Sequence, residues 1–286
     1  MKIYVILVAA LFALSACKPR MQTEKERFLT VSIEPLRFFT QAIAGDKFRI
    51  TTMVPDGSNP ETYDPTPQQL VDLGRSKAFL RIGYIGYELV WADKLKQNAP
   101  GVEFFDMSQG VDLIAEEGFE HHGHIHSAGV EPHIWASTIN AHIIIENICH
   151  ALERIDPKNA SFYKHNADSM TQVVQATDHT IRQYLKNNKP TFLIYHPSLS
   201  YFARDYGLTQ LSIEEDGKEP LPSRLQSLIR QCREDSVRVI FIQKEFDTKN
   251  AEMITKEIGA SVITINPLNY HWDKEMIDIA KSLVQK

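Results

Sequence analysis

The chain of 286 residues is long enough for one large or two medium domains. Hydrophobic residues make up 43% of it and charged residues 23%, which is the composition of an ordinary globular protein. The formal net charge is −5, and no segment is basic enough to form a nucleic-acid surface. We therefore exclude a nucleic-acid partner and favour, mildly, a cationic or neutral ligand.

The first sixteen residues have the features of an export signal. Lys2 gives a positive start, residues 3–14 are apolar, and Leu-Ser-Ala-Cys at 14–17 follows as a processing site. The apolar run is shorter than the roughly twenty residues that span a bilayer. The tetrapeptide resembles the bacterial lipobox, whose cysteine becomes the lipid-bearing first residue of the mature protein. We therefore expect a signal peptide over 1–16, a lipid on Cys17, a flexible tether over 17–27, and a membrane-anchored protein outside the cytoplasm.

Strand-like and helix-like segments alternate through the rest of the chain. We expect strands over residues 28–33, 48–54, 78–82, 102–105, 191–195, 208–213, 237–242 and 262–265. We expect helices over residues 35–45, 66–73, 87–96, 137–154, 198–206, 222–234, 248–258 and 272–284. Alternation of this kind predicts an α/β fold with mainly parallel sheets.

One segment is longer than a single domain needs. From Pro157 to about Asn188 there is no further Pro or Gly, and apolar residues recur at helical spacing. A helix of about 32 residues at about 1.5 Å per residue would be about 48 Å long. We expect two α/β lobes, 28–155 and 190–286, joined by one rigid helix over 156–189, although two helices with a break near 177–179 remain an alternative.

Two cysteines remain after the export signal. Cys149 and Cys232 fall in different expected lobes, so a disulfide between them is disfavoured even in an oxidising compartment. We expect two separate buried thiols.

The segment from Glu120 to Trp135 reads EHHGHIHSAGVEPHIW and holds five of the eleven histidines. Neutral imidazole is the commonest metal-ligand side chain, and four imidazoles within six residues make a high-capacity chelator. Glycine and serine in and after this cluster indicate a mobile loop rather than a helix or strand. The four histidines that form this candidate auxiliary metal loop are His121, His122, His124 and His126. The alternative is a solvated polar loop.

Three further side chains lie where strands give way to loops. Glu61 is in a turn-rich loop after the expected strand 48–54, His133 follows the histidine-rich segment, and His196 directly follows strand 191–195. Ligands of parallel sheets bind at the carboxyl ends of the strands. One carboxylate and two imidazoles suit the tetrahedral coordination of Zn²⁺, although the spacing alone is a weak signal.

The chain resembles a known family, the cluster A-I metal-binding lipoproteins of bacterial ABC importers, which bind zinc or manganese. The motifs that carry the resemblance are VPDGSNPETYDP at 54–65, EPHIW at 131–135, YHPSLSYF at 195–202, DYGL at 205–208 and TINPL at 264–268. They span nearly the whole mature chain in the family's order. The resemblance implies two α/β lobes joined by a long helix, one metal ion between them, and delivery of that ion to an inner-membrane ABC permease without catalysis.

The resemblance also implies a ligand set. The family's second and third histidine ligands fall on His133 and His196, whereas the place of the first histidine is taken here by Glu61. The family's carboxylate before Pro-Leu is matched by Asn266, whose neutral amide is a poor zinc ligand. The fourth ligand is thus left open between water, Asn266 and another residue.

The histidine-rich loop favours Zn²⁺ over Mn²⁺, because manganese prefers carboxylates and other oxygens. Family members with such a loop are generally zinc binders. A manganese-binding protein of the same family is the first alternative. A secreted zinc hydrolase is the second, although the chain has no His-Glu-x-x-His or Gly-x-Ser-x-Gly motif. We expect a monomer that is not an enzyme.

Overall fold

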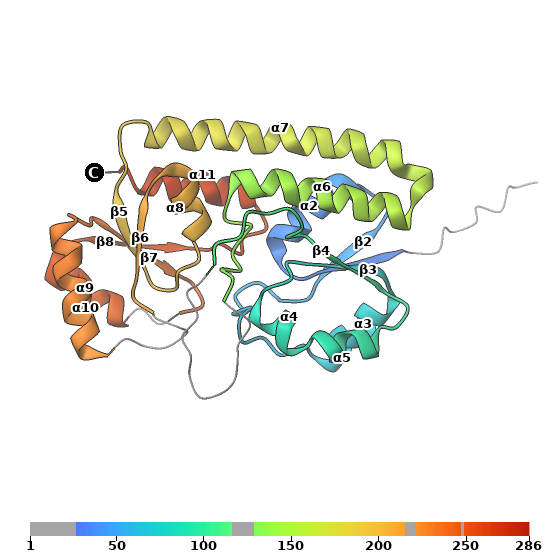
Figure 1. Ribbon diagram of the computed structural model, residues 1–286, viewed down its shortest axis with the longest axis horizontal. Coiled ribbons are helices and arrows are strands. Elements are labelled where there is room, and N and C mark those ends of the chain that lie inside the picture. Colours follow the sequence, from blue (N-terminus) through green and yellow to red (C-terminus); the bar gives the residue numbers. More distant parts are fainter. Residues whose placement is uncertain (1–26, 116–128, 215–220, 247–248, 286) are drawn as a thin grey trace, which may run out of the picture.

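A computed structural model of the protein describes residues 27–115, 129–214, 221–246 and 249–285. The protein has two α/β lobes that lie side by side, and one long helix, α7, runs along both of them (Figure 1). Each lobe is built on a four-stranded sheet with helices around it. The expected fold class is confirmed.

The sheet of the first lobe is entirely parallel. Its strands are β1 (Phe28–Val31), β2 (Arg49–Thr52), β3 (Ser76–Arg81) and β4 (Glu103–Asp106). They lie in the order β2-β1-β3-β4. The chain therefore leaves β1 to one side and returns on its other side, which creates a topological switch point between β1 and β3.

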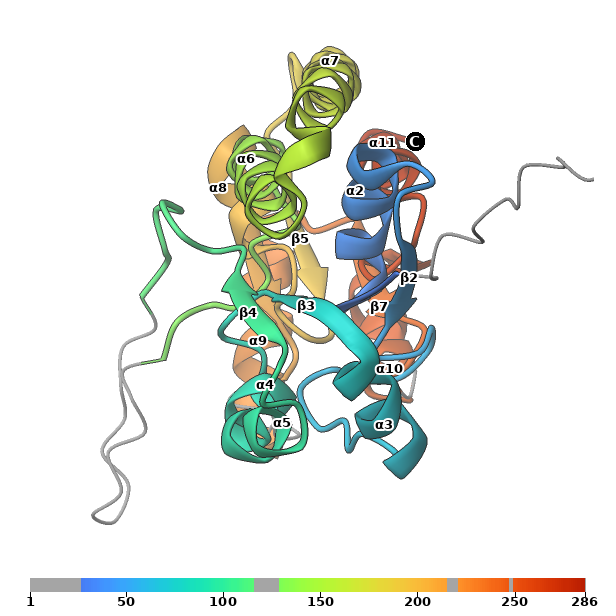
Figure 2. The same cartoon turned by 90° about the vertical axis from the view of Figure 1, so that its right-hand side faces the viewer.

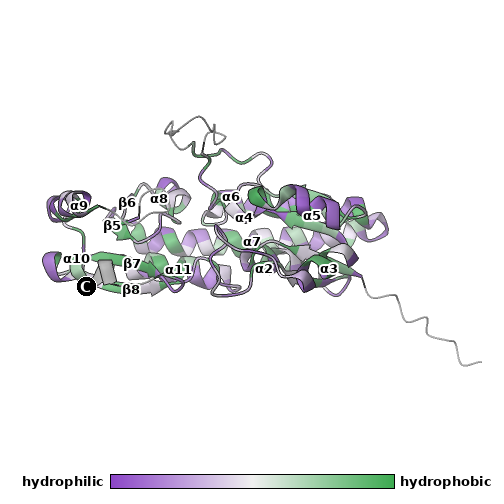
Figure 3. Cartoon of the chain, turned by 90° about the horizontal axis from the view of Figure 1, so that it is seen from below, coloured by the Kyte–Doolittle hydropathy of each residue, from purple (hydrophilic) through white to green (hydrophobic). Residues whose placement is uncertain are grey.

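The second lobe repeats this arrangement. Its strands are β5 (Thr191–Ile194), β6 (Thr209–Ser212), β7 (Val239–Gln243) and β8 (Ser261–Ile265). They are parallel and lie in the order β6-β5-β7-β8, so the switch point is between β5 and β7. Figure 3 shows β7 in the green of apolar residues and the outer helices α9 and α5 largely in purple. Strands that are buried on both faces in this way are typical of parallel sheets.

Local sequence signals begin and end the helices around the sheets. These helices are α2 (Glu34–Ala44), α3 (Pro67–Arg75), α4 (Gly86–Val90), α5 (Ala92–Asn98), α6 (Thr138–Ile155), α8 (Ser200–Tyr206), α9 (Pro222–Glu234) and α10 (Lys249–Ile258). Thr66 and Gln69 form a capping box on α3, and the Ser137 hydroxyl accepts the Asn140 N–H in the first turn of α6. Gly207 ends α8 with a φ of 65°, a conformation that favours glycine.

The single helix expected over 87–96 is wrong, because α4 and α5 are separate helices. Trp91 lies between them with φ −96° and ψ 0°, outside helical geometry. The Trp91 indole donates a hydrogen bond of 2.9 Å to Asp64, which lies in a distant loop. The break is thus stabilised by a tertiary contact, and no Pro or Gly marks it in the sequence.

The long helix α7 (Ala160–Leu185) is continuous, so the alternative of a break near 177–179 is wrong. It has 26 residues, about 39 Å at about 1.5 Å per residue, and follows a 3-10 turn at Pro157–Asn159. It packs against α6 and α2 of the first lobe and against the C-terminal helix α11 (Trp272–Ser282) (Figure 2). The residue boundaries that we give to the lobes stay a prediction.

Apolar packing joins the two lobes beneath α7. The Trp272 indole donates a hydrogen bond of 2.6 Å to the backbone oxygen of Trp135, and the Trp135 indole donates one of 3.0 Å to Pro267. The Phe39 and Trp272 rings are 5.0 Å apart. One core cluster therefore continues from the first lobe into the second. Cys149 belongs to this cluster and Cys232 to a second cluster in the outer part of the second lobe, and both thiols are free and buried.

Asp156, which is 4% exposed, ties the turn before α7 to the start of β1. Its carboxylate accepts hydrogen bonds from Arg27 at 2.8 Å, Asn159 at 2.7 Å and Tyr163 at 2.5 Å. Burial alone would raise the pKa of Asp156, but these hydrogen bonds outweigh burial and lower its pKa to about 2. The ionised carboxylate therefore stabilises the folded state.

We expect Asp156→Asn to lower the free energy of unfolding at pH 7 by about 2 kcal/mol, because charged hydrogen bonds are replaced by neutral ones. A folded pKa below the unfolded value of about 3.9 means that the contribution is complete above pH 4 and is lost as pH falls towards 2. Urea unfolding of both proteins across this range measures it. The control is Glu103→Gln, which removes an exposed ion pair with Arg154 and is expected to cost less than about 1 kcal/mol. Equal losses in the two variants would contradict the role of Asp156.

Candidate metal site

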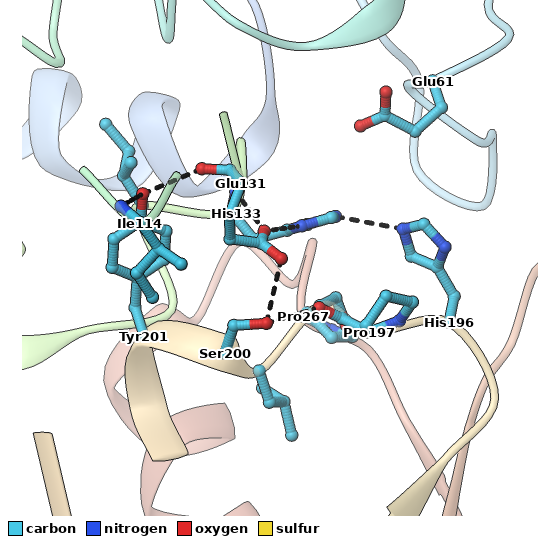
Figure 4. Close-up of polar contacts among 12 residues, drawn as sticks. Glu61, Ile114, Glu131, His133, His196, Pro197, Ser200, Tyr201 and Pro267 are labelled. Atoms are coloured by element: carbon cyan, nitrogen blue, oxygen red, sulfur yellow. Dashed lines mark hydrogen bonds and ion pairs between the residues drawn. The ribbon is translucent and has the colours of Figure 1, made fainter. Parts of the chain in front are cut away.

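The candidate site is built on two imidazole rings from different lobes. His133 lies in the turn before α6 of the first lobe, and His196 follows β5 of the second. Their Nε2 atoms face each other at 3.3 Å (Figure 4). His133 is 4% exposed, and the His196 side chain is 17% exposed, so both rings are largely removed from water.

Glu131 fixes the His133 ring. One oxygen of its carboxylate contacts His133 Nδ1 and also accepts the His133 backbone N–H at 2.9 Å. The other oxygen accepts the Ser200 hydroxyl at 2.9 Å, and the Glu131 backbone oxygen accepts the Tyr201 hydroxyl at 2.8 Å, both from α8 of the second lobe. Burial would raise the pKa of Glu131, but the charge and hydrogen bonds of His133 lower it. Glu131 is thus an ionised acceptor that holds the ring and links the lobes.

Glu214, just after β6, fixes the His196 ring in the same way. Its carboxylate contacts His196 Nδ1 at 2.8 Å. The His196 ring stacks on Phe246 with centroids 5.4 Å apart, and the Gln243 amide donates to the His196 backbone oxygen at 2.6 Å. Carboxylates that hold the far nitrogen of a ligand imidazole are the usual outer partners of metal-binding histidines.

These contacts decide which nitrogen of each ring faces the other. An ionised carboxylate only accepts hydrogen bonds, so each Nδ1 carries the proton and each Nε2 of a neutral ring carries a lone pair. Two lone pairs that face each other repel unless a proton or a metal ion lies between them. Two nitrogens bound to one tetrahedral Zn²⁺ at about 2.0–2.1 Å each would be about 3.3–3.4 Å apart. The observed 3.3 Å between His133 Nε2 and His196 Nε2 matches this separation.

Glu61 lines the same cavity from the loop between β2 and α3. One oxygen, Oε2, accepts the Gly86 backbone N–H at 2.9 Å, and the other, Oε1, is buried without a hydrogen-bond partner in the described part of the chain. A side chain at Gly86 would meet the Glu61 backbone oxygen at 2.4 Å, so glycine is required for this approach. Figure 4 shows Glu61 apart from the two histidines, with no contact drawn to either ring.

The cavity bounded by these groups is small, with a volume of about 10 Å³. That is about the volume of one water-sized sphere and suits a single ion better than an organic ligand. Its lining includes Glu61, His133, His196, Glu245 and Pro267. Among the described residues, no three His, Cys, Asp or Glu side chains are already close enough to hold a metal ion together. The histidine pair is thus in coordinating geometry, whereas the carboxylates must approach it.

The ligand roles of Glu61, His133 and His196 stay predictions. The lipid on Cys17 and the auxiliary metal loop of the histidines at 121, 122, 124 and 126 also stay predictions, and these residues lie outside the described ones. Three carboxylates of the site do not follow from our reading of the sequence. They are Glu131, Glu214 and Glu245. Each lies beside a predicted ligand or within two residues of the carboxyl end of a strand, and that position is the signal that could have found them.

Two α/β lobes with a small cavity lined by residues of both are the arrangement expected of a solute-binding protein. The family model "Zinc-uptake complex component A periplasmic" matches residues 29–284, and the chain belongs to this family. The family consists of substrate-binding components of transport systems. Within the described residues, no helix has the length and apolar character needed to cross a membrane.

Three named relatives differ in the metal that their names give. A metal ABC transporter substrate-binding lipoprotein of Streptococcus parasanguinis is 29% identical over 90% of this chain and 85% of its own. The high-affinity zinc uptake protein ZnuA of Bacillus subtilis is 27% identical over 82% and 76%. A manganese ABC transporter substrate-binding lipoprotein of Streptococcus pneumoniae is 29% identical over 88% and 84%.

Two solved structures have the same fold. A crystal structure of ZnuA superimposes with a TM-score of 0.84 at 32% identity, covering 91% of this chain and 98% of that one. A ZnuA deletion mutant with zinc bound gives a TM-score of 0.83, also at 32% identity, over 91% of this chain and 97% of its own. The family expected from the motifs is confirmed.

Proposed function

We propose that this protein captures Zn²⁺ outside the cytoplasm and delivers it to an ABC-type membrane permease for uptake. The observation that carries the proposal is the pair of carboxylate-held imidazoles, His133 and His196, whose Nε2 atoms are 3.3 Å apart between the two lobes. Relatives named for zinc uptake and a zinc-bound structure of the same fold support the choice of ligand.

Zinc fits this site better than manganese. Imidazole ligands suit Zn²⁺, whereas Mn²⁺ favours carboxylates and other oxygens. The pneumococcal relative named for manganese keeps that ion as the alternative. Competition between Zn²⁺ and Mn²⁺ for the purified protein distinguishes a zinc carrier from a manganese carrier. We expect Zn²⁺ to bind more tightly. Preferential Mn²⁺ binding would overturn the zinc assignment.

The division of the site between lobes suits a carrier that must also release its ion. His133 and Glu61 belong to the first lobe, and His196 belongs to the second. Movement of one lobe relative to the other would separate the two imidazoles and weaken binding. We infer that docking on the permease uses such a movement, and that the carrier is a monomer anchored by a lipid on Cys17 and a tether over 17–27.

We further propose that the protein has no catalytic activity and is not a secreted zinc hydrolase. The support for this proposal is the family, which consists of substrate-binding components of transport systems. The experiment combines metal analysis of the purified mature protein with assays on ester, peptide and phosphate substrates. We expect one tightly bound zinc per chain and no turnover. Absence of tight zinc binding, or metal-dependent turnover, would overturn the proposal.

Deletion of residues 121–126 is expected to leave the tight zinc site intact and to remove only weaker, additional binding. The residues on either side of residues 116–128 are paired with each other. Ala115 and Val130 form an antiparallel β-bridge, and the Glu131 N–H donates to the Ile114 backbone oxygen at 3.0 Å. His133 therefore keeps its own support. Calorimetry with Zn²⁺ measures both events, and a variant with the four histidines changed to serine controls for loop length. Loss of the tight event would place the primary site on the loop.

A further inference from the structure

Glu245 lies at the switch point of the second lobe. It follows β7 by two residues, as His196 follows β5 by two residues, and β5 and β7 are paired neighbours in which Ile194 lies opposite Phe241. The carboxyl ends of two strands that flank a switch point form the ligand-binding edge of a parallel sheet. Glu245 and His196 therefore extend from the same edge, and both line the cavity of about 10 Å³.

One oxygen of the Glu245 carboxylate is left without a partner by the folding contacts of the described residues. Its Oε2 atom is buried and has no hydrogen-bond partner among the described residues. A buried carboxylate oxygen without a partner is costly, unless a cation or a donor arrives. Burial raises the pKa of Glu245, whereas a hydrogen bond from its own backbone N–H and the nearby His196, Lys244 and His133 act in the opposite direction. The group is thus placed where a metal ion would satisfy it.

Glu61, which lines the same cavity, has the same property. Its Oε1 atom is also buried and without a partner among the described residues. Two carboxylates and two imidazoles would give Zn²⁺ four protein ligands, and the two negative charges would balance the charge of the ion. Two nitrogens and two oxygens are an acceptable tetrahedral set for zinc.

Asn266, the other candidate from the chain itself, is engaged elsewhere. Its side-chain oxygen accepts the Leu268 N–H at 3.2 Å, and its amide nitrogen donates to Asp56 at 3.3 Å. The cavity is lined by the next residues, Pro267 and Leu268, and not by Asn266.

We propose that Glu245 is the fourth protein ligand of the metal ion, completing the set of Glu61, His133 and His196. This inference rests on the proposed function, because it assumes that zinc binds between the two histidines. It predicts that the second lobe supplies one imidazole and one carboxylate, as the first lobe does.

The test is Glu245→Gln, which keeps the shape of the side chain and removes its charge. Glu234→Gln is the matched control, because Glu234 is an exposed carboxylate at the end of α9 in the same lobe. Competition with a chelating dye measures Zn²⁺ affinity, and the visible absorption of bound Co²⁺ reports the ligand set directly. We expect Glu245→Gln to weaken Zn²⁺ binding by more than about 10-fold and to change the Co²⁺ spectrum, since even partners outside the ligand set change affinity by about 10- to 100-fold.

The two readouts separate this inference from the proposed function. Parent-like affinity and an unchanged Co²⁺ spectrum in Glu245→Gln would overturn the role of Glu245 while leaving zinc capture intact. Weakened affinity with an unchanged Co²⁺ spectrum would also overturn it, because Glu245 would then act only on the surroundings of the site. Failure of the parent protein to bind zinc would instead overturn the proposed function.

Discussion

Replacement of His196 with alanine is expected to lower zinc affinity by more than about 100-fold. Loss of an outer carboxylate partner lowers metal affinity by about 10- to 100-fold, and loss of the ligand itself removes a metal–nitrogen bond as well. The variant also leaves the Glu214 carboxylate without the imidazole that it contacts at 2.8 Å. Competition titration with Zn²⁺ measures the loss.

Two further variants make the result for His196 specific. His179→Ala removes an exposed imidazole on α7 and is expected to bind zinc like the parent protein. Glu214→Gln keeps the His196 ring but removes the charge behind it, and we expect a loss of about 10- to 100-fold. His196→Ala with parent-like affinity, and with thermal unfolding unchanged, would show that the ion is held elsewhere.

Glu61→Ala is expected to weaken zinc binding at least as much as the loss of an outer partner does, which is about 10- to 100-fold, because it removes both a ligand and a negative charge. Glu61→His is expected to retain substantial binding, since imidazole is an equally suitable zinc donor. The same competition titration compares the two variants. The structure adds a second role for this side chain, because Glu61 Oε2 accepts the Gly86 N–H at 2.9 Å.

Glu61→Gln separates these two roles. Its amide oxygen can still accept the Gly86 N–H, but it lacks the charge and is a weaker zinc ligand. We therefore expect Glu61→Gln to unfold like the parent protein and to bind zinc nearly as weakly as Glu61→Ala. Parent-like zinc affinity in both variants would mean that Glu61 only supports the loop and that the first lobe supplies another ligand.

The sequence was sufficient to predict the two lobes and the long helix. Strands of parallel sheets are apolar on both faces, and each was separated from the next by a helix with a readable start or end, such as Ser137 or Gly207. The segment from Pro157 to about Asn188, which has no further Pro or Gly, then predicted α7, whose observed bounds are Ala160–Leu185. These features follow from local physics and need no knowledge of distant contacts.

The parts that could not be predicted depend on such contacts. The break between α4 and α5 is supported by the hydrogen bond from Trp91 to Asp64, 27 residues away in the chain. Glu245 reaches the site only because β7 pairs with β5, a choice that the order of segments leaves open. Glu214 likewise meets His196 only through the pairing of β6 with β5. Strand order therefore determines which carboxylates of the second lobe reach the site.

The central claim is that a single Zn²⁺ lies between His133 and His196. Diffraction from crystals of the zinc-loaded protein, collected on both sides of the zinc absorption edge, tests it most directly. We expect one strong anomalous peak at about 2.0–2.1 Å from the Nε2 atom of each histidine. A principal peak elsewhere, or Nε2 atoms without an ion between them in a protein that has bound stoichiometric zinc, would contradict the claim.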